Sequence, residues 1–229
     1  PVIVDFYRAV GYLPWAIDNY LALLGWSYDD KTEFFTREEL VKNFSLERIN
    51  SSPASFDPKK LWAVEDHFMS ALSTDEKLTL MLPFLVQAGL VADPPAAEQA
   101  EIVRRVIEAS GDRLKVAGDI LAYADFFLVD EPAMEAEAVA KRLATPAARQ
   151  HLEAFAAALS TVEPFEPGQL EAALKATAEA AGVKAGDLVH PIRVAVTGRT
   201  VGPGLYDCLA ILGRERSLAR IARALPLCG

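Results

Sequence analysis

The stretch VAVTGRTVGPGL, residues 194–205, combines the end of a helix with an abrupt break in the chain. Its small residues predict a helix that runs into Thr197 and Gly198. The chain then breaks at Gly202-Pro203-Gly204, because glycine adopts conformations closed to other residues and proline cannot continue a helix. Such a stretch suits a phosphate cradle, a catalytic loop, or a corner that presents one arginine and a few backbone groups to a partner.

A phosphate cradle of the P-loop type needs a lysine and a preceding β-strand. The segment GRTVGPG, residues 198–204, has three glycines and a threonine but neither of these features. The chain also lacks the G-x-G-x-x-G pattern and the G-x-S-x-G nucleophile elbow. Its histidines and cysteines are isolated, without the spacing of zinc ligands: His67, His151, His190, Cys208 and Cys228. The sequence therefore predicts no catalytic residue and no metal site in this chain.

Outside this stretch, the sequence has residues that typically begin and end helices. Pro14 occupies a favoured first helical position, and Thr36 with Glu39 forms a capping box. No stretch alternates apolar and polar residues with period two, so an extended sheet is not expected. We predict an all-α fold, a curved stack of helices with at most a short strand or two in the N-terminal part. We expect three parts, at residues 1–72, 73–130 and 131–229.

Prolines and acidic residues place further helix starts. Pro132 and Pro146 are each expected one or two residues inside a new helix, and Pro167 begins another that finishes at Gly182. Asp112 is expected to cap a helix that extends to about residue 129.

The charge is acidic overall but basic near the C-terminus. The formal net charge of −9 argues against a uniformly basic nucleic-acid binder. Between His190 and Leu225 the local balance is nevertheless +4, from six arginines against two acids: Arg193, Arg199, Arg214, Arg216, Arg220 and Arg223 against Asp207 and Glu215. This end suits docking of a polyanion, because binding responds to the local potential. A solvated helix face is the alternative interpretation.

The chain also lacks the signals of membrane insertion. Its longest apolar runs fall far short of the roughly 20 residues that cross a bilayer, and no leader segment opens it. We expect a soluble cytoplasmic protein without membrane contacts. The first residue is Pro1 rather than methionine, which is compatible with a processed chain or with a piece of a longer protein, so a missing motif is no argument against a parent protein.

Three long motifs, in order, carry a resemblance to a known family. They are GYLPWAIDNYLALLGWS at 11–27, FSLERINSSPASFDPKKL at 44–61 and HPIRVAVTGRTVGPGLYDCLAILGRERSLARIARAL at 190–225. Together they resemble the C-terminal half of a bacterial-type glutamyl-tRNA synthetase. After Lys60-Leu61 the family has a W-x-N-G-x-[YH]-[IL] stretch, and WAVEDHFM replaces it here, so the chain resembles a diverged member.

The resemblance implies that catalysis and tRNA binding belong to different parts of a longer enzyme. The family's H-I-G-H and K-M-S-K-S elements, which bind and activate ATP, are not in this chain. ATP, magnesium and L-glutamate are then expected to act only through a missing catalytic domain, and the chain is expected to be inactive alone. What remains corresponds to a stem-contact segment, residues 1–72, followed by two helical anticodon-binding domains. The implied partner is glutamate tRNA, bound by a monomer.

The resemblance also implies which residues contact RNA. Arg113 falls, near a helix start, where the family places an anticodon-reading arginine, which goes with preference for glutamate tRNA over glutamine tRNA. Arg193 falls in the family's P-[LI]-R motif at the anticodon loop. Gly202 and Leu205 fall where backbone and apolar contacts to an anticodon base are expected, and Arg199 beside them is expected at a phosphate. An arginine fork suits this task because its donors have fixed geometry.

Structural interpretations of the same residues stay open. Arg113 also suits a surface arginine that balances Asp112, and 194–205 suits a helix–turn–helix elbow capped by Thr197. The elbow is compatible with RNA contact. For the whole chain, the alternative function is a free-standing all-α adaptor that uses the fold for protein contacts.

Overall fold

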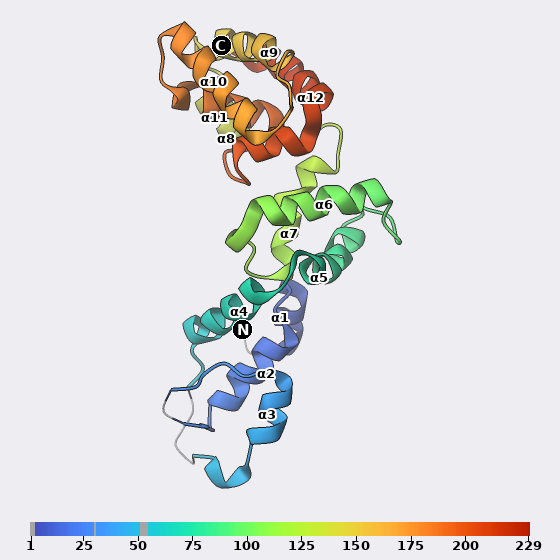
Figure 1. Ribbon diagram of the computed structural model, residues 1–229, viewed down its shortest axis with the longest axis vertical. Helices are drawn as coiled ribbons and strands as arrows, with labels where there is room; N and C mark the ends of the chain where they lie inside the picture. The colour runs from blue at the N-terminus through green and yellow to red at the C-terminus, as the bar shows by residue number, and fades with distance from the viewer. Residues whose placement is uncertain (1–2, 30, 51–54) are drawn as a thin grey trace. The chain divides into compact units, whose positions relative to one another are not determined.

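The computed structural model describes residues 3–29, 31–50 and 55–229. The chain forms two compact units, one of Pro1–Phe84 with Gly111–Ile120 and one of Leu85–Ser110 with Leu121–Gly229. In the described residues all regular structure is helical, so the all-α prediction is confirmed (Figure 1). The division into three parts stays a prediction.

The first unit contains helices from the N-terminal third of the chain. They are α1 (Val4–Val10), α2 (Pro14–Leu23), α3 (Arg37–Asn43), a 3-10 helix (Leu46–Arg48), α4 (Pro58–Ala71) and α5 (Thr74–Gln87), whose last residues belong to the second unit. The capping box of α3 is confirmed: Thr36 N–H donates to the Glu39 carboxylate at 2.8 Å, and Glu39 N–H donates to the Thr36 hydroxyl at 3.2 Å. Within the described part, the strand-like pairing in this unit is a single bridge between Trp26 and Ile49.

A close backbone approach joins segment 111–120 to the end of α1. Gly11, which ends α1 with φ +96°, accepts a hydrogen bond from Ala117 N–H at 2.9 Å. A Cβ on Gly118 would lie 2.4 Å from the carbonyl oxygen of Val10, which no side chain tolerates. Glycine at this point therefore allows two backbones to touch.

The same contact explains why the helix expected from Asp112 to residue 129 is wrong. This region forms 3-10 helices at Gly111–Arg113, Ala117–Asp119 and Asp125–Phe127, with only the short α7 (Ile120–Ala124) between them. The Asp119 carboxylate accepts the N–H groups of Lys115 at 2.8 Å and Val116 at 3.1 Å. Side-chain capping of this kind competes with a continuous helix.

A buried carboxyl group lies at the start of α2. Glu65, on α4, has no exposed surface and accepts the Leu13 N–H at 3.0 and 3.1 Å. This N–H precedes the first turn of α2, where the helix supplies no acceptor of its own. Burial raises the pKa of Glu65 from 4.5 to about 8, against the opposing effect of the Leu13 hydrogen bond.

The second unit contains the remaining helices. They are α6 (Ala97–Ser110), most of α7, α8 (Ala136–Arg142), α9 (Ala148–Leu159), α10 (Pro167–Ala181), α11 (Ala185–Thr197) and α12 (Leu205–Ala224). Helix α11 contacts α8, α9, α10 and α12 and thus lies at the centre of this group (Figure 1). Its apolar face is fully buried at Leu188, Ile192 and Val196.

Helix starts in this unit agree only partly with the sequence predictions. Pro167 begins α10 and Gly182 ends it, as predicted. The starts expected beside Pro132 and Pro146 are wrong, because α8 begins at Ala136 and α9 at Ala148. Before α8 the chain is extended at Glu135, whose N–H donates to the Gly198 carbonyl oxygen at 2.8 Å.

One buried arginine connects three parts of the second unit. Arg220, on α12, is 3% exposed. Its Nη1 donates to the Val196 carbonyl oxygen, and its Nη2 donates to those of Phe126 and Val129, each at 2.7 Å. Val196 lies in the last turn of α11, where carbonyl groups lack helical partners. Burial lowers the Arg220 pKa to about 10, with further lowering by Arg216 and Arg223, so the side chain stays charged at neutral pH.

The Glu65 pKa predicts how the first unit responds to pH. Between pH 4.5 and about 8 the folded state holds a proton that the unfolded state releases, so the free energy of unfolding falls as pH rises through this window and then levels off. Glu65→Gln should flatten this dependence and exceed the wild type in stability at pH 9. Urea denaturation followed by tryptophan fluorescence measures it, since all three tryptophans belong to the first unit. The exposed control Glu38→Gln should keep the wild-type profile, and an unaltered profile in Glu65→Gln contradicts the assignment.

The Arg220 contacts predict a large loss of stability on truncation. Arg220→Met leaves two carbonyl groups, those of Phe126 and Val196, without their donor, and each buried unsatisfied group costs about 1–3 kcal/mol. The free energy of unfolding of the second unit should fall by about 2 kcal/mol or more. Arg223→Met removes a half-buried arginine that pairs with exposed Glu131 at 3.0 Å, and should cost about 1 kcal/mol or less. Urea denaturation followed by circular dichroism measures the unfolding free energy of both variants. Equal losses would contradict a larger stabilising role for Arg220 than for Arg223.

Candidate nucleic-acid interface

The stretch 194–205 forms a tight corner between α11 and α12. Helix α11 ends at Gly198, which adopts φ +78°, and a Cβ there would lie 2.1 Å from the carbonyl oxygen of Ala133. Thr197 is fully buried; its hydroxyl donates to the Arg193 carbonyl at 2.8 Å and accepts the Arg199 N–H at 3.3 Å. The predicted elbow, capped by Thr197, is therefore confirmed.

Arg193, on α11, is held by the turn that precedes α12. Its side chain is half-buried, and Nη1 donates to the Pro203 carbonyl oxygen at 2.7 Å. In the described residues this is the hydrogen bond that holds the guanidinium, so Nη2 and Nε keep donors for another molecule. The structure thus brings Arg193 to the Gly202-Pro203-Gly204 turn, as an interface role requires.

Gly202 and Leu205 lie on either side of that turn. Gly202 is half-buried and adopts φ +146° near the Phe126 ring. Leu205, the first residue of α12, is only 4% exposed. Apolar contact of Leu205 with a base would thus use a small part of its side chain.

Arg199 is bound more firmly than the sequence suggests. Its Nη1 donates to the Ala122 carbonyl oxygen at 2.9 Å, and its Nη2 forms an ion pair with Asp125 at 2.6 Å. The guanidinium carbon lies 5.2 Å from the centroid of the Phe126 ring, and the side chain is 16% exposed. These contacts give Arg199 a structural role, and its contact with a phosphate stays a prediction. Sequence spacing offers no signal for Asp125, which lies 74 residues earlier.

The other arginines of the basic end also bind within the chain. Arg214 donates to the carboxylate of Glu163 at 2.9 Å and to the carbonyl of Val162. Arg216 donates to the carbonyl oxygens of Phe127 and Val129 at 2.9 Å. The interpretation of this end as a solvated helix face is therefore wrong, because the guanidinium groups satisfy carbonyl groups of the protein itself.

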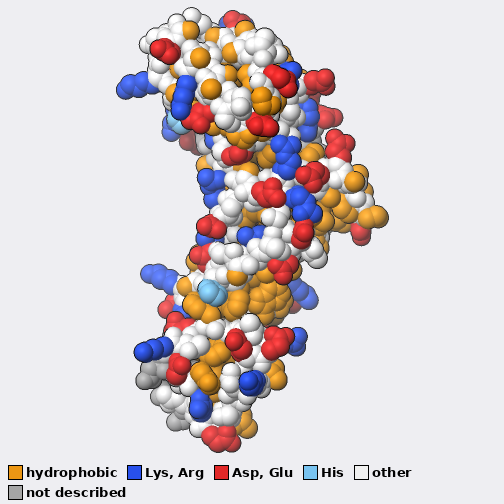
Figure 2. Space-filling view, in the orientation of Figure 1, with side chains coloured by type: hydrophobic (Ala, Val, Ile, Leu, Met, Phe, Trp, Pro, Cys, Tyr) orange, Lys and Arg blue, Asp and Glu red, His pale blue; other side chains and the backbone are white. Residues whose placement is uncertain are grey.

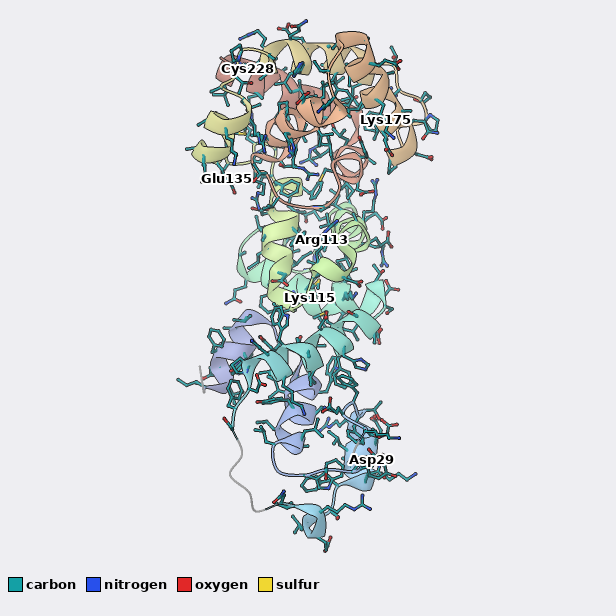
Figure 3. The ribbon with its side chains drawn as sticks, turned by 90° about the vertical axis from the view of Figure 1, so that its left-hand side faces the viewer. Asp29, Arg113, Lys115, Glu135, Lys175 and Cys228 are labelled. Atoms are coloured by element: carbon teal, nitrogen blue, oxygen red, sulfur yellow. The ribbon has the colours of Figure 1, made fainter. Side chains whose placement is uncertain are left out.

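Arg113 belongs to the first unit and is described there by itself. It is exposed and ends the 3-10 helix Gly111–Arg113, whereas the sequence places it near the start of an α-helix (Figure 3). Close by in the sequence, Lys115 forms an ion pair with Asp66 of α4, which fastens this segment to the unit. Of the five predicted contact residues, the structure gathers Arg193, Arg199, Gly202 and Leu205 in one corner.

Two kinds of site are not found in the part of the chain that the structure describes. None of its helices combines the length and apolarity needed to span a membrane. No three His, Cys, Asp or Glu side chains in this part are grouped so as to hold a metal ion.

Comparison with protein families shows which kind of domain contains the 194–205 corner. Residues 76–225 match the family described as "Anticodon binding domain". The chain belongs to this family. Residues 1–63 match part of a second one, "tRNA synthetases class I (E and Q), catalytic domain", so the chain carries a small piece of a catalytic domain before the anticodon-binding domain.

Individual relatives agree with this assignment. The chain is 39% identical over 221 residues to the glutamate–tRNA ligase of Moorella thermoacetica, covering 96% of this chain and 45% of the relative. It is 42% identical over 231 residues to that of Chloroflexus aurantiacus, covering 98% and 45%. A crystal structure of a glutamate tRNA ligase from Elizabethkingia meningosepticum, in complex with its amino acid, superposes with a TM-score of 0.82 at 25% identity, covering 96% of this chain and 42% of that one. The resemblance inferred from the three motifs is thus confirmed, and the chain spans less than half the length of these relatives.

The anticodon-binding domain should depend on glycine at position 198. Gly198→Ala combines a left-handed φ with a Cβ placed against Ala133, a conformation that costs about 1–3 kcal/mol. Thermal unfolding followed by circular dichroism should show a lower midpoint. Gly186→Ala, in the first turn of α11 with nothing within 4 Å of its added Cβ, is the control and should be neutral or slightly stabilising. An undiminished midpoint in Gly198→Ala contradicts the tight corner.

Proposed function

We propose that this chain is the tRNA-binding portion of a glutamyl-tRNA synthetase, which holds glutamate tRNA and reads its anticodon. The observation that carries the proposal is the match of residues 76–225 to the anticodon-binding domain. The names of the relatives, glutamate–tRNA ligases, supply the amino-acid specificity. The rest of a longer enzyme would bind ATP, magnesium and L-glutamate and carry out glutamylation in the cytoplasm.

In this proposal the corner at 193–205 is a preformed base pocket. Unpaired anticodon bases expose hydrogen-bonding edges that a protein can read. Arg193 supports the role because Pro203 fixes the orientation of its guanidinium while Nη2 and Nε keep donors available. A fixed fork discriminates between bases, since a wrong base leaves its donors unpaired. Arg199 then acts through its bonds to Ala122 and Asp125, which hold the corner in shape, and any phosphate contact is secondary.

Arg113 supplies the second reading element of the proposal. Its exposure allows contact with RNA, and the ion pair of Lys115 with Asp66 restrains the segment that carries it. The proposed task of Arg113 is to prefer glutamate tRNA over glutamine tRNA. The adaptor alternative gains no support from the comparisons, because the relatives are ligases. We further propose that the chain binds RNA as a monomer.

The test is a binding titration of the 229-residue chain with glutamate tRNA, glutamine tRNA and a tRNA of unrelated anticodon. We expect a preference for glutamate tRNA and affinity that falls steeply as salt concentration rises. Arg113→Ala and Arg193→Ala should each lower the preference by about 1–3 kcal/mol, because each removes a base contact. Lys175→Ala, which removes an exposed cation paired with Glu171 on α10, should leave the preference unchanged. Equal affinity of the wild type for all three RNAs would contradict the proposal.

A further inference from the structure

A cationic pocket lies in the second unit, bounded by helices α8, α9 and α11. Its volume is about 380 Å³, and its lining includes four basic side chains, Lys141, Arg142, His151 and His190. Asp187 is the acidic group of the lining, and it is engaged with its own helix, since it accepts the Lys184 N–H at 3.1 Å. Figure 2 shows Lys and Arg side chains beside a histidine on the face of this unit.

Arg142 is the unusual member of this group. In the described part of the second unit, the other arginines each form a hydrogen bond or an ion pair within the chain: Arg104, Arg105, Arg149, Arg193, Arg199, Arg214, Arg216, Arg220 and Arg223. Arg142 has no such contact among the described residues, although its Nε is shielded from solvent. The Nε atoms of Arg199, Arg214 and Arg220 are equally shielded, but the terminal nitrogens of those residues are bonded. A half-buried guanidinium without a partner within the described residues is available to an acceptor from another molecule, because shielded polar groups are nearly always hydrogen-bonded.

The pocket continues the face that carries Arg193. His190 precedes Arg193 by three residues on α11, which places both on one side of the helix. Partial burial lowers the pKa of His190, and the charges of Arg142 and Arg193 lower it further while Asp187 opposes them. The two arginines thus act on the same imidazole, so an RNA strand at Arg193 has this pocket as its neighbour.

We propose that Lys141, Arg142, His151 and His190 bind a backbone phosphate of the RNA strand whose bases lie at the 193–205 corner. This inference rests on the proposed function and adds a contact that positions the strand without reading its sequence. Charge-assisted bonds from an arginine fork to phosphate oxygens are among the strongest available. Removal of a contact with the RNA backbone lowers the affinity for all RNAs alike, whereas removal of a contact with a base alters the preference between RNAs.

A structural role for the same cations predicts a different outcome. Lys141 and Arg142 form the last turn of α8, where positive charge stabilises a helix end. If this were their whole role, Arg142→Ala would lower thermal stability and leave RNA affinity unchanged. Since Arg142 has no hydrogen bond within the described residues, we expect its truncation to leave the unfolding midpoint nearly unaltered.

The first test measures affinity of the 229-residue chain for an anticodon stem-loop RNA. Arg142→Ala should weaken binding about tenfold, since a charge-assisted hydrogen bond contributes about 1.5 kcal/mol or more. The slope of log affinity against log salt should fall by about 1, and the preference for the glutamate anticodon should stay as in the wild type. Gly186→Glu should have a similar effect, because it adds a carboxylate to the open pocket while an acidic residue suits the first turn of α11. Lys175→Ala is the charge-matched control; losses in Arg142→Ala no larger than in this control overturn the inference.

The second test locates the contact by NMR of the imidazole groups. The chain has three histidines, and His67, which is not a lining residue of this pocket, stacks on Phe34 in the first unit with a centroid distance of 3.8 Å. Stem-loop RNA should shift the resonances of His151 and His190 in the wild type and not in Arg142→Ala. Shifts with inorganic phosphate but none with RNA show a site for free phosphate, and they overturn the inference, as does the absence of any shift. If the wild type binds RNA without anticodon preference, the proposed function fails while the phosphate contact is still measured.

Discussion

The second unit depends on hydrogen bonds from arginine side chains to backbone carbonyl groups, with Arg220 at the centre. Its guanidinium satisfies the carbonyl oxygens of Phe126, Val129 and Val196, which come from two separate segments. Carbonyl groups at helix ends and in 3-10 turns have no partner within their own element. A planar fork with five donors satisfies several of them at once, which no neutral side chain does. The geometry of the 193–205 corner follows, because Val196 lies in the helix that ends there.

This use of arginine changes what the local charge means. A balance of +4 between His190 and Leu225 suggests an electrostatic surface, yet most of these guanidinium groups point at the protein's own oxygen atoms. The structure distinguishes arginines that bond to oxygen atoms of the protein from arginines that do not, and a count of charges cannot make this distinction. Arg193 is partly engaged, and Arg142, outside the counted segment, has no partner within the described residues. The proposed RNA contacts of Arg193 and Arg142 therefore follow from donors that have no partner among the described residues.

The sequence predicted the helical class, several helix ends and the corner, because these depend on local chemistry. Thr36 with Glu39, Pro167 with Gly182 and Thr197 act on residues within a few positions of themselves. The failures have a different origin. The helix expected after Asp112 breaks because Gly118 lies against Val10, a contact about a hundred residues away along the chain. The partners of Arg199 lie 74 and 77 residues earlier in the chain, and the family resemblance indicated its position but not its ion pair. Likewise, Glu65 lies in the stretch WAVEDHFM, which departs from the family pattern, and its burial beneath α2 has no signal in the sequence.

The corner is held at both of its ends. Gly198 accepts the N–H of Glu135, and Pro203 accepts the side chain of Arg193. With these anchors fixed, the segment between them has a set length. An inserted residue would have to bulge out between the two anchors, next to the nucleotide proposed at Arg193, and a deletion would strain the Arg193–Pro203 hydrogen bond. Loop length is therefore as strong a constraint on evolution at this point as the identity of the residues it contains.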